Sequence, residues 1–339
     1  MKLKKSSMIT KGIACIAMIT LCVTSAPGVI SAENSATVEE FVEDFAEMVS
    51  EKEVTITMTK PVMDDDSVYG SYYELENDNQ YAGYVIYSYD EDDIIEYSFE
   101  EQDGSMFEGR EDEEVLYRND PLDYEIDTFS SSSSSYDDVW DVIEDTPSVA
   151  NNSGYTYYRA KYLKKRSMYS EDDMDDWGLD KDMWYGCAPM AMLNVCRECS
   201  FFDLNSTADI VAAYTNLYAL AGTDSNGNTS ESVLGWTIAS FARIMKNISV
   251  DYTYEVNPTT SYFLSAVNSN YPSIIGMIGG DGGHAVSVNG YIQYKRNSTG
   301  GVRTYLCVAD GWYSRTRYIC FTMADLEHTS GTVIQYETR

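Results

Sequence analysis

One cysteine of this chain stands where a protein backbone favours a reactive thiolate. Cys187 follows Gly186 and begins a mainly apolar run that reaches Val195, which is typical of a buried helix. Pro189 falls in the first turn of that helix, where its missing N–H has no helical partner to lose. The N–H groups and the macrodipole at a helix N-terminus favour the thiolate, which is the nucleophilic form of cysteine. Cys187 is therefore a candidate nucleophile; the alternative is a small buried side chain at a helix start.

A nucleophilic cysteine needs a base and a group that orients the base, and the chain has only two histidines. His284 follows a glycine-rich loop and begins an apolar stretch typical of a strand, whereas His328 lies in a polar segment that we expect at the surface. Asp310 ends the next apolar strand and is followed by Gly311 and Trp312. We expect the Asp310 carboxylate to accept the imidazole N–H and Trp312 to shield that bond from water.

The sequence Gly-His-Ala-Val-x-Val-x-Gly-Tyr around His284, followed by a strand and Asp-Gly-Trp, resembles the papain-like cysteine peptidases. The compact bacterial members, of the C39-like, streptopain and staphopain types, are the more similar, because Cys187 precedes His284 by 97 residues, whereas the plant and lysosomal enzymes need roughly 130–150. The resemblance covers about the last 190 residues. It implies peptide-bond hydrolysis through a Cys187–His284–Asp310 triad and a thioester, on a protein or peptide substrate and without a metal or organic cofactor.

The resemblance fails at one position of the expected oxyanion site. Members of this family usually carry a glutamine five or six residues before the cysteine, where this chain has Lys181 and Asp182. The Cys187 N–H can supply one donor, and Lys181 is the candidate for the second. Losing one such donor costs on the order of a hundredfold or more in rate.

The segments around these residues predict an α+β domain over 167–339, with helices first and antiparallel strands after. That order is also the layout of the papain-like fold, in which a helical subdomain faces a sheet. After the helix of Cys187, periodicity predicts further helices over Thr207–Leu220, Glu231–Ile248 and Thr259–Val267. Strands are predicted over Ser273–Ile278, Ala285–Gln293, Thr304–Ala309, Arg317–Phe321 and Thr332–Tyr336.

The first 32 residues have the pattern of a secretory signal peptide of bacterial type. A lysine-rich start precedes an apolar core over 12–23, and Ile30-Ser31-Ala32 is an acceptable cleavage site. The core is too short to span a bilayer. We therefore expect an exported protein without a stable membrane anchor.

The acidic residues are concentrated in the N-terminal half. Residues 33–150 hold 36 acidic and 4 basic residues, whereas residues 151–339 hold 19 and 15. A contrast of this size favours two domains and argues against nucleic acid as a partner. Spacing predicts a helix over Val38–Val49 and then strands, so 33–129 is expected to be a small helix-plus-sheet domain. It resembles the inhibitory propeptide of the streptopain type; an adhesion or stability domain is the alternative.

The segment 130–166 is expected to connect the two halves. Six serines at 130–135 are typical of a flexible linker, and the stretch to Tyr158 has no regular pattern. The basic run 161–166 follows. A protease-sensitive activation segment is one interpretation, and a solvated loop or a basic docking face for the acidic half is the other.

Five cysteines remain after the expected signal peptide, which fits one reactive thiol and four others. A cross-strand disulfide between Cys307 and Cys320 is consistent with the spacing, and Cys196 and Cys199 are thiols or a local bridge. The four lack paired CxxC spacing, which disfavours zinc. Taken together, the residues predict a secreted cysteine peptidase made as a zymogen. The alternatives are a non-catalytic binding module of the same fold and a cell-wall amidase or acyltransferase with the same triad.

Overall fold

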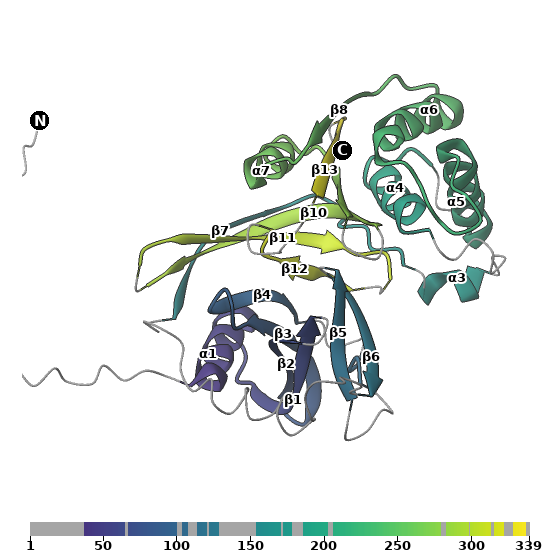
Figure 1. Ribbon diagram of the computed structural model, residues 1–339. Helices are drawn as coiled ribbons and strands as arrows, with labels where there is room; N and C mark the ends of the chain where they lie inside the picture. Colours follow the sequence, from purple (N-terminus) through teal and green to yellow (C-terminus); the bar gives the residue numbers. More distant parts are fainter. Residues whose placement is uncertain are drawn as a thin grey trace, which may run out of the picture. The chain divides into compact units, whose positions relative to one another are not determined.

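The described part of the chain is a mixed α+β structure with one large, mostly antiparallel sheet (Figure 1). The signal peptide expected at 1–32, the serine run 130–135 and Lys181 lie outside the described residues. The computed structural model describes residues 37–64, 67–99, 104–107, 114–120, 122–128, 154–170, 172–177, 186–202, 206–278, 283–297, 299–312, 315–321 and 328–336.

The described residues of the N-terminal half form one helix and six strands. Helix α1 (Val38–Ser50) begins at a capping box, in which Thr37 and Glu40 satisfy each other's backbone N–H groups, and it buries a stripe of apolar residues. A turn at 77–79 joins β2 to β3 and places Asp78 and Asn79 at positive φ, which these residue types tolerate. The strands are β1 (Thr55–Asp64), β2 (Ser67–Asn77), β3 (Gln80–Ser88), β4 (Asp93–Ser98), β5 (Glu114–Asp120) and β6 (Asp123–Thr128).

The C-terminal half places its helices before most of its strands, as the sequence predicts. In Figure 1 α4, α5 and α6 lie together, and α4 packs on β9 and β10. The helices are α3 (Asp172–Trp177), α4 (Cys187–Glu198), α5 (Thr207–Ala221), the short 3₁₀ helix η2 (Glu231–Val233), α6 (Leu234–Lys246) and α7 (Thr260–Asn268). The strands are β7 (Tyr155–Tyr162), β8 (Asp251–Val256), β9 (Ser273–Ile278), β10 (Gly283–Arg296), β11 (Val302–Ala309), β12 (Arg317–Ile319) and β13 (His328–Gln335).

The two halves share one sheet, which the sequence does not predict. Strand β4 of the N-terminal half pairs with β12 of the C-terminal half, Tyr97 opposite Tyr318, so the order runs β6-β5-β1-β2-β3-β4-β12-β11-β10-β9-β13-β8. The rings of Tyr97 and Tyr318 stack with their centroids 4.7 Å apart. Side chains from both halves also meet in one apolar cluster, in which Phe45 of α1 packs against Tyr294 and Tyr305. The boundary between the halves is therefore built like a protein core.

The expectation of an irregular stretch up to Tyr158 is wrong for residues 155–158. They belong to β7, which pairs with β10, and a partner strand distant in sequence supplies the regularity that the local pattern lacks. Gly290 allows this close approach, because a Cβ atom there would lie 2.7 Å from the carbonyl oxygen of Lys161. Strands β5, β6 and β8 are also absent from the prediction; the six residues of β8 are mostly exposed and show no two-residue alternation of burial.

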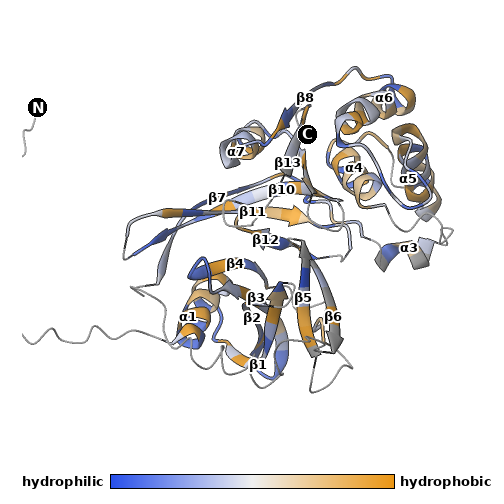
Figure 2. Ribbon diagram, viewed as in Figure 1, coloured by the Kyte–Doolittle hydropathy of each residue, from blue (hydrophilic) through white to orange (hydrophobic). Residues whose placement is uncertain are grey.

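The segments around the helix of Cys187 are both apolar in sequence and buried in the structure. Figure 2 shows long apolar stretches in α4 and β11, and ten of the twelve residues of α4 are buried. No helix in the part of the chain that the structure describes is long and apolar enough to cross a bilayer.

Candidate active site

Cys187 is the first residue of α4, as the sequence predicts, and its side chain is half-buried. The first helical hydrogen bond runs from the Met190 N–H to the Gly186 carbonyl, at 2.9 Å, so the helix itself provides no acceptor for the N–H of Cys187. Position 186 has no room for a side chain, because a Cβ atom there would lie 2.4 Å from the hydroxyl oxygen of the buried Tyr214. The Cys187 thiol donates to the carbonyl of Gly283, the first residue of β10, with Sγ 3.8 Å from the oxygen.

His284 enters the same region from β10. It is the second residue of that strand, directly after the carbonyl that Cys187 contacts, and only 4 % of it is exposed. In the β10–β11 register Ser287 lies opposite Ala309, so the residues just after β11 continue beside the start of β10. The Trp312 ring accordingly packs on the imidazole, with the centroids 4.5 Å apart. The structure thus brings Cys187, His284 and Trp312 together.

Burial sets the protonation state of His284. It lowers the imidazole pKa to about 4, because the charged ring would lose its water. The main chain and carboxylate of Asp310 act in the opposite direction, and the cation of Arg317 adds to the lowering. Neither ring nitrogen makes a hydrogen bond of standard geometry to the described residues. At neutral pH the ring is therefore neutral, which is the form a general base requires.

A cavity of about 510 Å³ opens at these residues. Its lining surface is mainly apolar, and Glu231 of η2 is the one residue with a formal charge among the described residues that line it. Its lining residues are Cys187, Ala188, Asn226, Gly227, Asn228, Thr229, Glu231, Leu234, Gly283, His284, Ala285 and Trp312. The candidate nucleophile and the candidate base thus share a space large enough for a side chain of a substrate.

Asp310 lies where β11 ends, and the hydrogen bonds of its carboxylate differ from the prediction. One oxygen accepts the Trp312 backbone N–H at 3.0 Å, and the other accepts from Nη1 of Arg317 at 2.5 Å. Asp310 is fully buried. Asp310 raises the pKa of His284, and the shorter of the two carboxylate hydrogen bonds given above is the one from Arg317.

Arg317 is a residue of this site that sequence reasoning missed. It is buried on β12, and it binds Glu96 of the N-terminal half as well as Asp310, both at 2.5 Å. Its Nε also donates to the Tyr84 hydroxyl at 2.7 Å, and Nη1 to the Leu122 carbonyl at 2.7 Å. One signal was present in the sequence, because Glu96 interrupts the mainly apolar run from Ile94 to Phe99 and a buried carboxylate needs a partner.

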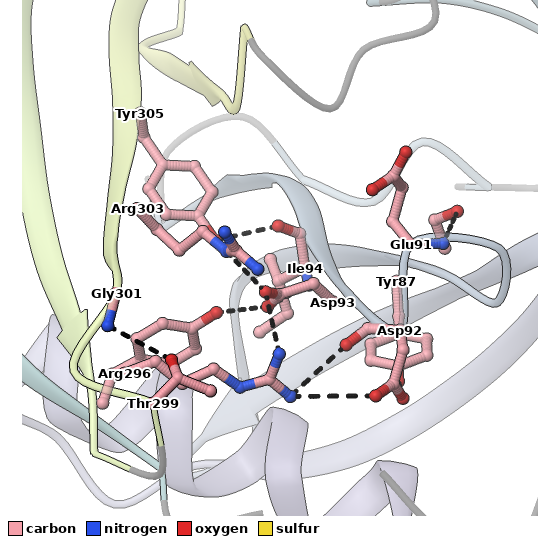
Figure 3. Close-up of polar contacts among 12 residues, drawn as sticks. Tyr87, Glu91, Asp92, Asp93, Ile94, Arg296, Thr299, Gly301, Arg303 and Tyr305 are labelled. Atoms are coloured by element: carbon pink, nitrogen blue, oxygen red, sulfur yellow. Dashed lines mark hydrogen bonds and ion pairs between the residues drawn. The ribbon is translucent and has the colours of Figure 1, made fainter. Parts of the chain in front are cut away.

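A second ionic contact joins the halves at the other end of β4. The buried Asp93 accepts from Arg303 of β11 at 2.8 Å and from Arg296 of β10 at 3.4 Å, and the hydroxyl of Tyr155 also donates to it (Figure 3). The Tyr305 hydroxyl donates to the neighbouring Ile94 carbonyl at 2.8 Å. The cations that pair with buried acids of the N-terminal half are thus Arg296 of β10, Arg303 of β11 and Arg317 of β12. The basic run 161–166 has other contacts.

That basic run is fixed to the C-terminal half. Lys165 donates from Nζ to the carbonyls of Arg197 and Glu198 at the end of α4, at 2.8 and 3.0 Å, where cations are favoured. Its backbone N–H donates to the Glu198 carboxylate at 3.0 Å, and burial lowers its pKa. Nearby, Asn194 of α4 exchanges two hydrogen bonds with the backbone of Tyr169. Residues 163–170 therefore support the helix that carries Cys187.

The remaining sequence predictions concern the other cysteines and the oxyanion site. All five cysteines beyond the signal segment are thiols. The disulfide that the spacing allows between Cys307 and Cys320 is not formed, and the β11–β12 register places Tyr318 opposite Cys307. Burial raises the pKa of both Cys196 and Cys199, which disfavours their thiolates. Lys181, the candidate second oxyanion donor, is outside the described residues.

No protein-family model matches the chain, and a search of curated proteins found no match.

Proposed function

We propose that this protein is a cysteine hydrolase that acts on peptide bonds, with Cys187 as nucleophile and His284 as base. The observation that carries the proposal is the meeting of a helix-start thiol and a neutral, buried imidazole in one cavity. Cysteine in other settings is mostly a small buried side chain, as Cys196 and Cys199 are here. Cys187 differs from them because it lines a cavity that the candidate base His284 also lines.

The chemistry follows from the protonation states. His284 takes the proton of the Cys187 thiol as the sulfur attacks the carbonyl carbon, and the C–S bond forms as the carbonyl becomes an oxyanion. The oxyanion expels the amine, which receives the proton from the imidazolium, and a thioester remains. Water, deprotonated by His284, then attacks the thioester; the C–S bond breaks, the acid product leaves, and the Cys187 sulfur takes the proton back from the imidazolium. The negative charge of Asp310 stabilises the imidazolium that forms, and the Trp312 ring covers the imidazole.

Of the two donors proposed for the oxyanion, one belongs to a described residue and the other does not. The N–H of Cys187 at the start of α4 is one donor, as in the sequence-based prediction. Lys181 stays the candidate for the second. The resemblance to the papain-like peptidases of the C39-like, streptopain and staphopain types is consistent with this assignment and stays a proposal.

We further propose that the protein is exported through its signal segment and processed between its halves. The described part of the connecting segment, 154–166, is held in the sheet and on α4, which makes it a poor protease substrate. Processing would therefore fall within 129–153. A cut there would leave the halves paired through β4 and β12, so that cutting and release of the acidic half are separate events.

The test is hydrolysis of a defined peptide library by the exported chain, read by mass spectrometry, with Cys187→Ala as the control. Cleavage that requires both Cys187 and His284 supports the proposal. Cleavage that persists in Cys187→Ala contradicts it. A reactive Cys187 that cleaves no peptide would indicate acyl transfer on other substrates, as in an amidase or acyltransferase, and an unreactive Cys187 would indicate a binding module.

A further inference from the structure

A chain of three buried charges runs from the N-terminal half to the candidate active site. Glu96 lies on β4, Arg317 on β12 and Asp310 after β11, and the exposed fraction of each side chain is 1 % or less. Arg317 binds the two carboxylates through different nitrogens, Nη2 to Glu96 and Nη1 to Asp310, each at 2.5 Å. Glu96, which belongs to the N-terminal half, is thus connected to the site through the guanidinium of Arg317.

The charges of Glu96, Arg317 and Asp310 do not cancel. Two carboxylates share one cation, and hydroxyl groups support the excess negative charge: the Tyr84 and Tyr124 hydroxyls donate to Glu96 at 2.6 and 3.0 Å. A cation shared by two carboxylates neutralises each of them less than a cation that pairs with one carboxylate alone. With Glu96 present, Asp310 therefore presents more negative charge to His284 than a simple Arg317–Asp310 pair would.

Two of these three charged groups act on the pKa of His284. The carboxylate and main chain of Asp310 raise its pKa, and Arg317 lowers it. A carboxylate beside an imidazole also favours the tautomer whose N–H faces it, and so fixes which nitrogen is free to act as base. Glu96 offsets the Arg317 cation, although it does not touch the ring.

We propose that Glu96 is a positioning residue for the His284–Asp310 pair, so that the acidic half supports the candidate active site to which it is attached. This inference rests on the proposed function for its catalytic meaning. It differs from the expectation that the acidic half is an inhibitor, because it makes that half a required part of the working site.

Two further observations agree with this role. None of the described residues that line the Cys187 cavity comes from 37–128, so in the described part of the chain the acidic half does not fill the site. The half is also held by strand pairing, by stacked tyrosines and by the Asp93 contacts, which are features of a permanent interface.

The test compares Glu96→Gln with Asp93→Asn in the full chain. Both residues are buried carboxylates on β4 that bind arginines of the C-terminal half, so both substitutions weaken the contact between the halves. Only Glu96 reaches Arg317 and Asp310. Tyr124→Phe, which removes one hydrogen bond to Glu96, is a milder third variant for the case that Glu96→Gln does not fold.

Two readouts are needed. The first is the rate of iodoacetamide labelling of Cys187 at pH 7, which we expect to fall on the order of tenfold in Glu96→Gln, less than the ~10⁴-fold cost of removing the acid of a triad. The second is the ring ¹⁵N chemical shifts of His284, assigned with His328→Gln, which report the tautomer without any need for activity. We expect Glu96→Gln, and to a smaller degree Tyr124→Phe, to change both readouts, and Asp93→Asn to change neither.

The outcomes separate this inference from the proposed function. If Glu96→Gln and Asp93→Asn have the same effect on both readouts, or if neither changes them, Glu96 is an interface residue only and the inference is wrong. If the His284 shifts respond to Glu96→Gln alone while wild-type Cys187 is unreactive, the positioning role stands and the proposed function fails.

Discussion

Glu96 and Asp310 hold the same guanidinium, that of Arg317, from the two halves of the chain and at the same distance of 2.5 Å. This relationship explains why the acidic half and the candidate active site form one structure. It also makes the interior of the molecule sensitive to single charge changes, because a buried charge without its partner is costly.

Arg317 should therefore be indispensable for stability. Arg317→Met leaves two buried carboxylates without a cation, and we expect it to lower the free energy of unfolding by about 3–5 kcal/mol at pH 7. Urea unfolding measures this, with Arg243→Met on the exposed face of α6 as control. A loss below 1 kcal/mol would contradict the assigned pairing.

His284 should make the protein less stable in mild acid. Its folded pKa is about 4 and its ordinary value is 6.5, so the unfolded chain binds the proton first as the pH falls. The stability that the neutral ring contributes is full above pH 6.5 and is lost between 6.5 and 4. From pH 8 to 5.5 the wild type should lose about 1–2 kcal/mol more than His284→Gln in urea unfolding. Equal losses would show that the ring is accessible to protons.

Gly186 should be required because of Tyr214. A methyl group at position 186 would meet the Tyr214 hydroxyl oxygen at 2.4 Å, and overpacking of this kind costs about 1–3 kcal/mol. We expect Gly186→Ala to lower the melting temperature and to slow labelling of Cys187. The same substitution in a Tyr214→Phe background should cost clearly less. If the cost is unchanged there, the hydroxyl is not the cause.

Glu231 should influence which substrates fit. Its carboxylate lines a mainly apolar cavity beside Cys187, and an anion in such a place favours a cationic side chain. In competition between peptides that differ only by Lys or its isosteric neutral analogue, Glu231→Gln should reduce the preference for Lys. The effect should weaken with added salt. A preference that survives the substitution would assign specificity to other lining residues.

The sequence was a good guide to local structure and a poor one to contacts between distant segments. Helix α1 could be predicted because its buried residues repeat at the helical period. The helix of Cys187 and strand β10 are buried almost throughout, and they could be predicted from their apolar runs. The pairing of β4 with β12 could not, because no local pattern specifies which strand edges meet. Strand β7 was missed for the same reason.

The candidate site shows the same division. Cys187, His284 and Trp312 were found because each stands in a distinctive local context, and they line one cavity. Arg317 was missed, since an arginine at a strand start is usually a surface residue and only its two acidic partners require it here. The acidic composition of the N-terminal half suggested docking on the basic run 161–166, whereas the docking contacts are made by Arg296, Arg303 and Arg317.

The most direct test of the account is thiol labelling of residues 33–339 with an iodoacetamide probe at pH 7. Peptide mapping would be used to compare the wild type with Cys187→Ala and His284→Ala. We predict fast labelling confined to Cys187 and lost or strongly slowed in His284→Ala, with slow labelling of the buried Cys196 and Cys199. An increase after limited proteolysis within 129–153 would add evidence for processing. Labelling of Cys187 that is no faster than that of the buried thiols, or that does not depend on His284, would contradict the assignment of this pair as nucleophile and base.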